Sequence, residues 1–205
     1  MKPAVLVKPV VFILFLLPAL YYFYAVFLAL RGENILGPDP ASTLALATGE
    51  WSIRILIASL AITPLRYLFK APKLWNCRRM IGLFALFYVC LHLLVFLMFL
   101  LQWDWSAIGT EIVERPYITI GFSAFVLMLP LGLTSTHWAQ RKLKRNWKRL
   151  HRLVYVINIL AVIHVIWIVR SSYFDAVLYG SLVFILLLYR ILHKNIPAVR
   201  RFALV

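Results

Sequence analysis

Residues 80–101 read MIGLFALFYVCLHLLVFLMFLL, an apolar run of 22 residues that carries one imidazole, His92, and no Asp, Glu, Lys or Arg. A transmembrane helix needs about 20 consecutive apolar residues, so this run is long enough to cross a bilayer. Five more apolar runs lie on either side of it, and together they predict an all-α polytopic membrane protein, a six-transmembrane-helix bundle. The predicted spans are residues 10–30, 51–69, 80–101, 117–136, 151–169 and 176–191.

The composition agrees with a bundle that occupies the whole chain. Of the 205 residues, 63% are apolar and 14% are charged, whereas an average soluble domain is about 45–50% apolar and 25% charged. The longest connections, residues 31–50 and 102–116, are too short for a soluble domain. We therefore expect residues 1–205 to form a single domain. Residues 10–30 exceed the h-region of a signal peptide, about 7–15 residues, which predicts a retained first helix.

The charges separate by side when the six spans alternate in direction. One side receives 18 of the 22 Lys and Arg, and the other receives four Arg with all seven acids, giving net charges of +18 and −3. Because short cytoplasmic loops are rich in Lys and Arg, both termini are predicted to be cytoplasmic. The overall charge of +15 then reports orientation in membrane lipid, and no nucleic-acid partner is expected. The acidic side holds Arg31, Arg54, Arg115, Arg170, Glu33, Asp39, Glu50, Asp104, Glu111, Glu114 and Asp175.

Two histidines lie deep inside predicted spans, His92 in the third and His164 in the fifth. Ionisable groups inside a membrane are costly and are functional candidates by default. Each lies 13 residues beyond the predicted inner end of its span, at Arg79 and His151, which is about 20 Å of helix. Two imidazoles at matched depth on two helices can bind one metal between them.

The residue types around this pair favour haem. A lone membrane histidine can instead bond a neighbouring helix or relay protons, but a relay normally adds Asp or Glu, and every acid lies outside the spans. Zinc takes three or four protein ligands, whereas haem needs only two axial ones. No C-x-x-C-H motif is present, so the haem would be non-covalent, of b type. An aromatic stripe suits a macrocycle: Phe84, Phe87, Tyr88, Phe96 and Phe99.

The inner end of the fifth span carries a third histidine, His151. Its 13-residue separation from His164 suits two stacked redox centres, but an ideal helix turns the two side chains about 140° apart, so a local bulge is needed. The third span offers Arg78 and Arg79 at the matching depth instead of a histidine. A second haem would therefore lack a ligand. Alternatively, His151 and these arginines hold an anion, a haem propionate or a flavin phosphate, or the arginines only anchor the inner face.

Several short motifs, taken in order, resemble one family along nearly the whole chain. They are GPDP at 37–40, ITPL at 62–65, RRMIGL at 78–83, LHL at 91–93, RPYITIG at 115–121, TST at 134–136, QRKL at 140–143, Trp147, LH at 150–151 and IH at 163–164. The chain resembles the MsrQ family, haem-binding membrane subunits of the bacterial MsrPQ protein-methionine-sulfoxide reductase system. That family belongs with the ferric reductase-like transmembrane domains.

The resemblance implies haem b, with His92, His151 and His164 matching the family's histidines. It implies an electron-transfer subunit of the bacterial inner membrane, not the catalytic subunit. Electrons would pass from the cytoplasmic side to a periplasmic molybdopterin enzyme that reduces methionine sulfoxide in oxidised envelope proteins. A quinone or a cytosolic flavin reductase is implied as donor, and FMN as a further cofactor. Oxidase relatives carry four haem ligands in two pairs, so one haem is favoured here over two.

Two other functions remain open from the residues. A self-sufficient transmembrane ferric or cupric reductase would need an outer metal site, and the outer loops offer acids but no His or Cys. A small transporter could use the two deep histidines as a proton or metal path. The visible spectrum of the purified protein separates this transporter from a haem protein.

Overall fold

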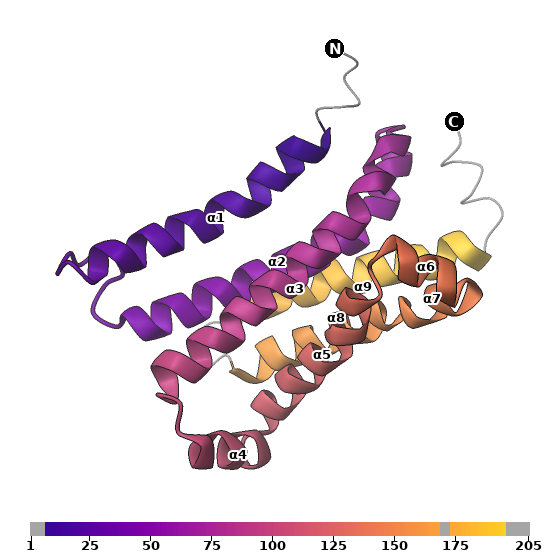
Figure 1. The fold of residues 1–205 in the computed structure, drawn as a ribbon. Helices are drawn as coiled ribbons and strands as arrows, with labels where there is room; N and C mark the ends of the chain where they lie inside the picture. The colour runs from indigo at the N-terminus through magenta and orange to yellow at the C-terminus, as the bar shows by residue number, and fades with distance from the viewer. Residues whose placement is uncertain (1–6, 169–172, 196–205) are drawn as a thin grey trace.

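In the computed structural model, residues 7–168 and 173–195 are described, and they form a bundle of helices (Figure 1). Six stretches within these ranges are long and apolar enough to cross a membrane, which confirms the predicted number of spans and a multi-pass membrane protein. The stretches are Val7–Ala29, Pro40–Leu68, Leu74–Leu100, Pro116–Leu133, Arg145–Ile168 and Phe174–His193.

The helices follow one another through short connections. Five of the six predicted spans start within about three residues of an observed helix start. The elements are α1 (Val7–Ala29), α2 (Pro40–Leu68), the 3-10 helix η1 (Pro72–Cys77), α3 (Arg78–Val95), the π-helix η2 (Phe96–Leu100), α4 (Trp105–Glu114), α5 (Pro116–Leu133), α6 (His137–Leu143), α7 (Arg145–Leu150), α8 (Leu153–Ile168) and α9 (Phe174–Asn195).

The second span differs from its prediction, because α2 begins at Pro40 and not near residue 51. Asp39 caps this helix: its carboxylate accepts hydrogen bonds from the Ser42 backbone nitrogen at 3.0 Å and from the Ser42 hydroxyl at 2.6 Å. Proline at the first helical position is favourable, since its missing N–H would have no partner there. The first turns of α2 mix polar residues with apolar ones, so they do not form the continuous apolar run by which hydropathy identifies a span.

The predicted connection 102–116 also contains a helix, α4. Its cap is Asp104, whose carboxylate accepts from the backbone nitrogens of Ser106 at 2.9 Å and Ala107 at 3.2 Å. A hydrogen bond from the Ser106 hydroxyl, together with these backbone bonds, holds the pKa of Asp104 below its ordinary value. Figure 1 shows α4 lying across one end of the long helices.

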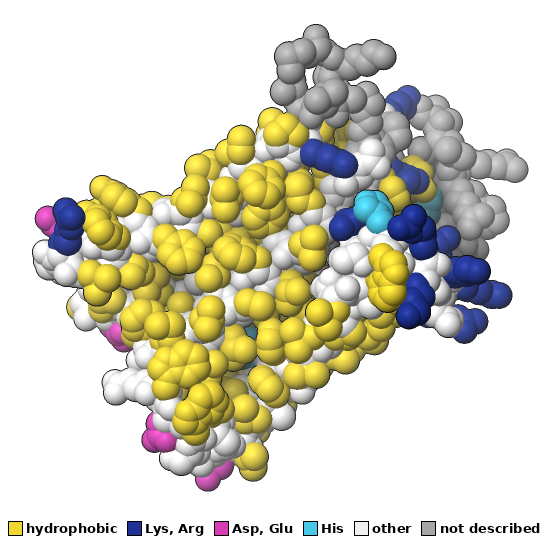
Figure 2. All heavy atoms as spheres, in the orientation of Figure 1, with side chains coloured by type: hydrophobic (Ala, Val, Ile, Leu, Met, Phe, Trp, Pro, Cys, Tyr) yellow, Lys and Arg dark blue, Asp and Glu magenta, His cyan; other side chains and the backbone are white. Residues whose placement is uncertain are grey.

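The centre of the bundle is α2, which is far more buried than the other spans. It packs most extensively on α3, while α5 packs most extensively on α8. Ile55 of α2, Tyr88 of α3 and Ile157 of α8 are fully buried in one shared core. The face of the bundle shown in Figure 2 is largely apolar between its two ends, which fits contact with lipid.

The two ends of the bundle carry opposite charge (Figure 2). We call the end that holds α6 and α7 the basic end, and the end that holds α4 the acidic end; the predicted separation of charge along the spans is present. Which end faces the cytoplasm stays a prediction. The predicted inner cations Lys2, Arg200 and Arg201, and the predicted outer Arg170, lie outside the described residues, as does Val169 at the end of the fifth predicted span.

Candidate functional site

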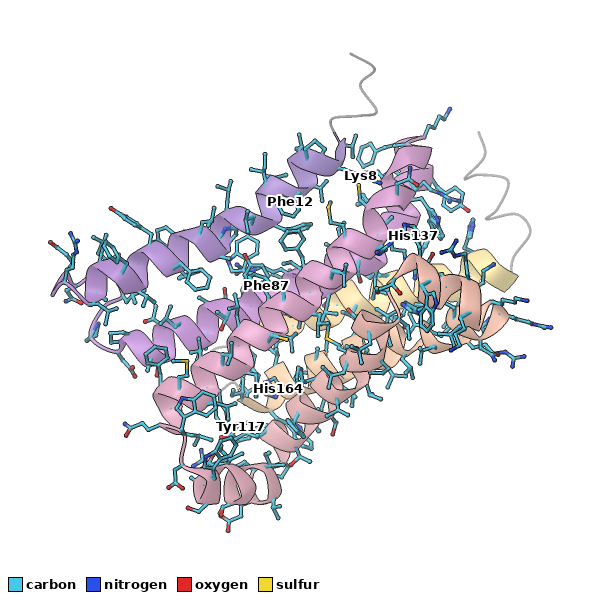
Figure 3. All side chains as sticks on the ribbon, viewed as in Figure 1. Lys8, Phe12, Phe87, Tyr117, His137 and His164 are labelled. Carbon is cyan, nitrogen blue, oxygen red and sulfur yellow. The ribbon has the colours of Figure 1, made fainter. Side chains whose placement is uncertain are left out.

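The structure places the two deep histidines side by side near the acidic end. His92 comes from α3 and His164 from α8, and their ring centroids are 6.4 Å apart with the ring planes at 77°. Figure 3 shows His164 beside Tyr117, the second residue of α5. We call His92 and His164 the imidazole pair.

The ring of His92 is held by α2. Its Nδ1 lies 2.9 Å from the backbone oxygen of Ala45, and because a carbonyl only accepts, Nδ1 carries the hydrogen. The hydroxyl of Thr48 lies 3.4 Å from the same nitrogen, but its stronger bond is donated to the Leu44 oxygen at 2.7 Å. Fixing the hydrogen on Nδ1 leaves the Nε2 lone pair available as a metal ligand.

The ring of His164 is held in the same way by α5. Its Nδ1 donates to the backbone oxygen of Tyr117 over 2.6 Å. In each case the histidine follows the residue that supplies the carbonyl by 47 positions. The two imidazoles therefore present the same tautomer, and among the described residues neither Nε2 has a hydrogen-bond partner.

The spacing of the imidazole pair fits two ligands of one metal. A metal–imidazole bond is about 2.0–2.1 Å, and a ring nitrogen lies about 1.1 Å from its ring centre, so rings on opposite sides of one metal have centroids about 6.3 Å apart. The observed separation is 6.4 Å. Two neutral imidazoles are a common axial set for haem iron, because the porphyrin supplies the other four nitrogens.

Two residues missed by the sequence reasoning complete this site, Gly49 and Gly121. A Cβ placed on Gly49 would lie 3.1 Å from Cε1 of His92, and one on Gly121 would lie 2.8 Å from Cε1 of His164. A signal was present in the sequence: each glycine precedes its histidine by 43 residues. Only the three-dimensional structure shows that each glycine contacts the histidine at this spacing.

Comparison with known proteins places this arrangement in a family. Residues 48–162 match the family described as "Ferric reductase like transmembrane component". The protein-methionine-sulfoxide reductase heme-binding subunit MsrQ of Xanthomonas campestris pv. campestris (strain 8004) is 46% identical over 161 residues, covering 78% of this chain and 74% of the relative. The chain belongs to the MsrQ family.

Two further MsrQ relatives extend the match. The subunit of Xanthomonas axonopodis pv. citri (strain 306) is 45% identical over 163 residues, covering 80% of this chain and 75% of its own. That of Polaromonas naphthalenivorans (strain CJ2) is 40% identical over 197 residues, covering 95% and 88%. No solved structure matches this MsrQ chain.

The third histidine of this MsrQ chain, His151, lies in the turn between α7 and α8. The helix is interrupted at His151 and Arg152. The imidazole stacks on Trp147, with centroids 3.9 Å apart and planes at 27°, and its Nδ1 lies 3.1 Å from the Trp147 oxygen. Its Nε2 is buried and has no partner among the described residues.

The two predicted anion-binding arginines separate. Arg79 is exposed, and its Nη1 lies 3.1 Å from Nε2 of His137. Arg78 is half-buried, with its guanidinium 5.2 Å from the ring centre of Trp75, and it lies close enough to His151 to act on it electrostatically. Adjacent helix positions point about 100° apart, so Arg78 lies near His151 while Arg79 faces the surface; an anion site that uses both arginines stays a prediction.

Arg190 of α9 joins this basic-end cluster and was missed from sequence. Its guanidinium donates to the Thr63 hydroxyl at 2.5 Å and to the Tyr155 hydroxyl, over whose ring it also lies. Arg190 and Arg78 also interact electrostatically. The two ion pairs among residues 7–168 and 173–195 are Arg54–Glu50 and Arg115–Glu111, and both lie toward the acidic end. In the sequence, the signal for Arg190 was its position as a cation inside the sixth predicted span.

The predicted aromatic stripe serves, in part, another purpose. Phe84 packs edge-on against Phe12 of α1, with centroids 5.2 Å apart, and the Tyr88 hydroxyl donates to the Phe15 oxygen at 2.8 Å. Phe12 and Phe87 line a shallow apolar groove between α1 and α3 (Figure 3). These contacts attach α1 to the bundle, which is the ordinary packing role of aromatic residues.

Proposed function

We propose that this chain is the haem-binding, electron-transferring membrane subunit of a bacterial protein-methionine-sulfoxide reductase system. Its partner is a periplasmic molybdopterin methionine sulfoxide reductase, which carries out the chemistry on oxidised envelope proteins. The chain is not the catalytic subunit. The observation that carries the proposal is the imidazole pair, spaced for one metal and with both Nδ1 atoms already bonded to carbonyls.

His92 and His164 would bind the iron of one haem b through Nε2. Bound haem supplies reversible one-electron chemistry at this position. The carbonyl oxygens of Ala45 and Tyr117 orient the two rings and keep Nε2 unprotonated. Hydrogen bonds of this kind raise the basicity of a histidine ligand and fix its direction.

The buried core between the two ends excludes water from the route that electrons would take. Ile55, Tyr88 and Ile157 are fully buried there, and the acidic side chains visible in Figure 2 lie toward the acidic end. Exclusion of water and of other charges disfavours proton leakage and side reactions of a reduced centre. The protein therefore acts as an insulated support between a donor on one side and the reductase on the other.

The basic end would receive an anionic group. Arg78 and Arg190 are unpaired with any carboxylate among the described residues, and the buried Nε2 of His151 has no protein partner there. Arginine suits bidentate binding of carboxylate or phosphate. The ligand would be a haem propionate or the phosphate of FMN; one haem is favoured, because no second histidine contacts His151 within the described residues.

The orientation follows from charge. The basic end would face the cytoplasm and the acidic end the periplasm of the bacterial inner membrane. A quinol, or the reduced flavin of a cytosolic flavin reductase, would then donate electrons at the basic end. Acidic residues around α4 would face the reductase, where charge complementarity raises encounter rates more than affinity.

The test is the cofactor content of the purified full-length protein. A pyridine haemochrome assay, a flavin assay and the visible spectrum are measured for the native chain, His92→Ala, His164→Ala and the matched control His137→Ala, whose ring is exposed at the basic end. We expect about one haem b per polypeptide, lost in the first two variants and kept in the control. No Soret band, or a band unchanged in both pair variants, would overturn the proposal in favour of a transporter.

A self-sufficient metal reductase is tested in the same preparation. Among the described residues, no three His, Cys, Asp or Glu side chains come together as an outer metal site would require. We expect reduced protein to be reoxidised by its reductase partner with methionine sulfoxide as terminal acceptor, and far more slowly by ferric or cupric ions alone. Equal rates with both acceptors would favour the metal reductase.

A further inference from the structure

Two glycines lie directly against the imidazole pair. A Cβ on Gly49 would meet the His92 ring at 3.1 Å from Cε1 and 3.3 Å from Nδ1, and one on Gly121 would lie 2.8 Å from both Cε1 and Nδ1 of His164. Non-bonded carbon atoms are normally about 3.5–4.0 Å apart. A methyl group on Gly121 therefore requires the ring of His164 to shift, whereas one on Gly49 requires the ring of His92 to yield by a few tenths of an ångström.

Each glycine lies one helical turn after the carbonyl that holds its ring. Ala45 and Gly49 share a face of α2, and Tyr117 and Gly121 share a face of α5, because residues four apart are neighbours on a helix. One stretch of each helix thus contacts its imidazole twice, with a hydrogen-bond acceptor and with an open backbone surface. The arrangement occurs twice, once in α2 with α3 and once in α5 with α8.

The contact differs from ordinary close packing of helices. Small residues in membrane helices often let two backbones approach, and other glycines here match that role: a Cβ on Gly132 would meet Leu86, and one on Gly180 would meet Val162. At Gly49 and Gly121, all three nearest atoms belong to the histidine ring. The space left by each missing side chain is occupied by the imidazole itself.

The ring cannot avoid an added methyl group without cost. Its Nδ1 is fixed to a carbonyl at 2.9 Å in His92 and at 2.6 Å in His164. Turning the ring would stretch that bond or redirect Nε2, the atom left for a metal. Groups that orient a metal ligand typically change metal affinity or activity by about 10–100-fold when they are altered.

We propose that Gly49 and Gly121 are positioning residues of the imidazole pair, each setting the direction in which one histidine presents Nε2. The inference rests on the proposed haem function and adds two residues to its site. Gly121 has the tighter contact, so it has the greater influence. Neither residue touches the iron; both act through a histidine.

The test compares Gly49→Ala and Gly121→Ala with two control variants. Gly82→Ala on α3 adds a methyl group where nothing lies within 4 Å, and Gly132→Ala on α5 adds one against Leu86, away from the histidines. We expect Gly121→Ala to lower haem affinity at least about tenfold, with loss of the low-spin bis-imidazole spectrum and a shifted midpoint potential. Gly49→Ala should do the same to a smaller extent. Gly82→Ala should match the native protein, and Gly132→Ala should change the unfolding midpoint but not the spectrum.

A double-mutant cycle tests the contact without haem. Gly121→Ala and His164→Ala are made singly and together, and unfolding midpoints of the haem-free protein are compared. If the methyl group clashes with the ring, Gly121→Ala destabilises the native chain but not the His164→Ala chain, where the ring is gone. Should Gly121→Ala alone fail to fold, recovery of folding in the double variant supports the contact equally well.

The outcomes separate this inference from the proposed function. A native chain without haem would overturn the function, while the cycle would still decide the contact. Spectra and potentials of the two glycine variants that equal those of Gly82→Ala would overturn the positioning role, with the haem function intact. A cost of Gly121→Ala that is the same with and without the His164 ring would also overturn it.

Discussion

At the acidic end, four helices hold two imidazoles, each bonded to a carbonyl and each touching a glycine. At the basic end, one imidazole lies in a turn, stacked on Trp147 and close to half-buried arginines. In the first arrangement both rings are held by hydrogen bonds to backbone carbonyls, which suits two neutral ligands of one metal. The second is cationic, and Nε2 of His151 has no partner there among the described residues, which suits the anionic edge of a cofactor or donor.

From this difference we infer different roles for the two ends of the bundle. The acidic-end pair would hold the haem that passes electrons to the reductase, whereas the basic end would receive them. A symmetrical protein with two equal haem sites would show matching ligand pairs at both depths. Substitutions at the two ends should therefore separate cofactor binding from electron uptake.

Among the substitutions that test whether the two ends act separately, His151→Ala should have the largest effect. The variant should keep the bis-imidazole spectrum of the His92–His164 site but lose at least about tenfold in the rate at which a quinol or reduced flavin reduces it. Stopped-flow reduction in proteoliposomes measures that rate, with His137→Ala as control. Loss of all haem in His151→Ala would show that the two ends are not separate sites.

The next effect distinguishes the two neighbouring arginines. Arg78→Gln should weaken binding of FMN roughly tenfold or more, because a hydrogen bond to a charged group contributes about 1.5–3 kcal/mol. Arg79→Gln removes an exposed side chain that contacts His137 and should leave the affinity nearly unchanged. Quenching of FMN fluorescence gives both dissociation constants, and equal losses would contradict the structural distinction.

A smaller effect should appear in acid, because the helix caps at the two ends differ. Asp104 caps α4 with a carboxylate whose pKa is lowered by hydrogen bonds from Ser106, whereas the hydroxyl of Thr136 caps α6. A lowered folded-state pKa gives a stabilisation that is complete above the ordinary value of 3.8 and is lost as the pH falls through the folded-state value. Acidification below pH 4 should loosen the first turn of α4 and not that of α6.

Amide hydrogen exchange at Ala107 and Ala139 measures this difference, with each amide compared at matched pH. Asp104→Asn provides the control, because Asn also caps helices but does not titrate in this range. Its α4 should show no acid-dependent loosening beyond the intrinsic exchange rate. Identical behaviour of the two caps in the native chain would contradict the prediction.

The smallest effect concerns the hydroxyl group that lies beside only one ring of the imidazole pair. The Thr48 hydroxyl lies 3.4 Å from Nδ1 of His92, which it precedes by 44 residues, and the residue at the same spacing before His164 is Ile120. Thr48→Val keeps the shape and removes this weak contact, so we expect the midpoint potential to move by no more than about 20–30 mV. Redox titration of the haem band checks it, and a shift as large as that of Gly49→Ala would rank Thr48 with the positioning residues.

The sequence predicted features that depend on composition along one helix. Six spans and the matched depth of His92 and His164 follow from counting apolar residues and helical rise, and the two rings do meet. The early start of α2 was also readable, since Asp39 precedes Pro40 and Ser42 in the order of a capped helix. Polar residues in those first turns hid it from a search for apolar runs.

Features that depend on contacts between helices were not predictable from one sequence. Arg78 and Arg79 are the same residue type at adjacent positions. Only the packing of α3 makes Arg78 half-buried and leaves Arg79 exposed. Gly49 and Gly121 have no side chain, so their residue type alone does not indicate a role. Their importance lies in what fills the space beside them, which is set by the partner helix.

The position of the imidazole pair along the bundle also has an electrical consequence. His92 lies 14 residues beyond the start of α3, or about 21 Å of a hydrocarbon layer roughly 30 Å thick. With the basic end in the cytoplasm, an electron that arrives there has moved outward across most of the membrane voltage. In a cell with a negative interior, a full crossing releases about 2.3 kcal/mol per electron for each 100 mV. The cell's membrane potential would thus help to drive repair outside the cytoplasm, and a weaker reductant would suffice as donor.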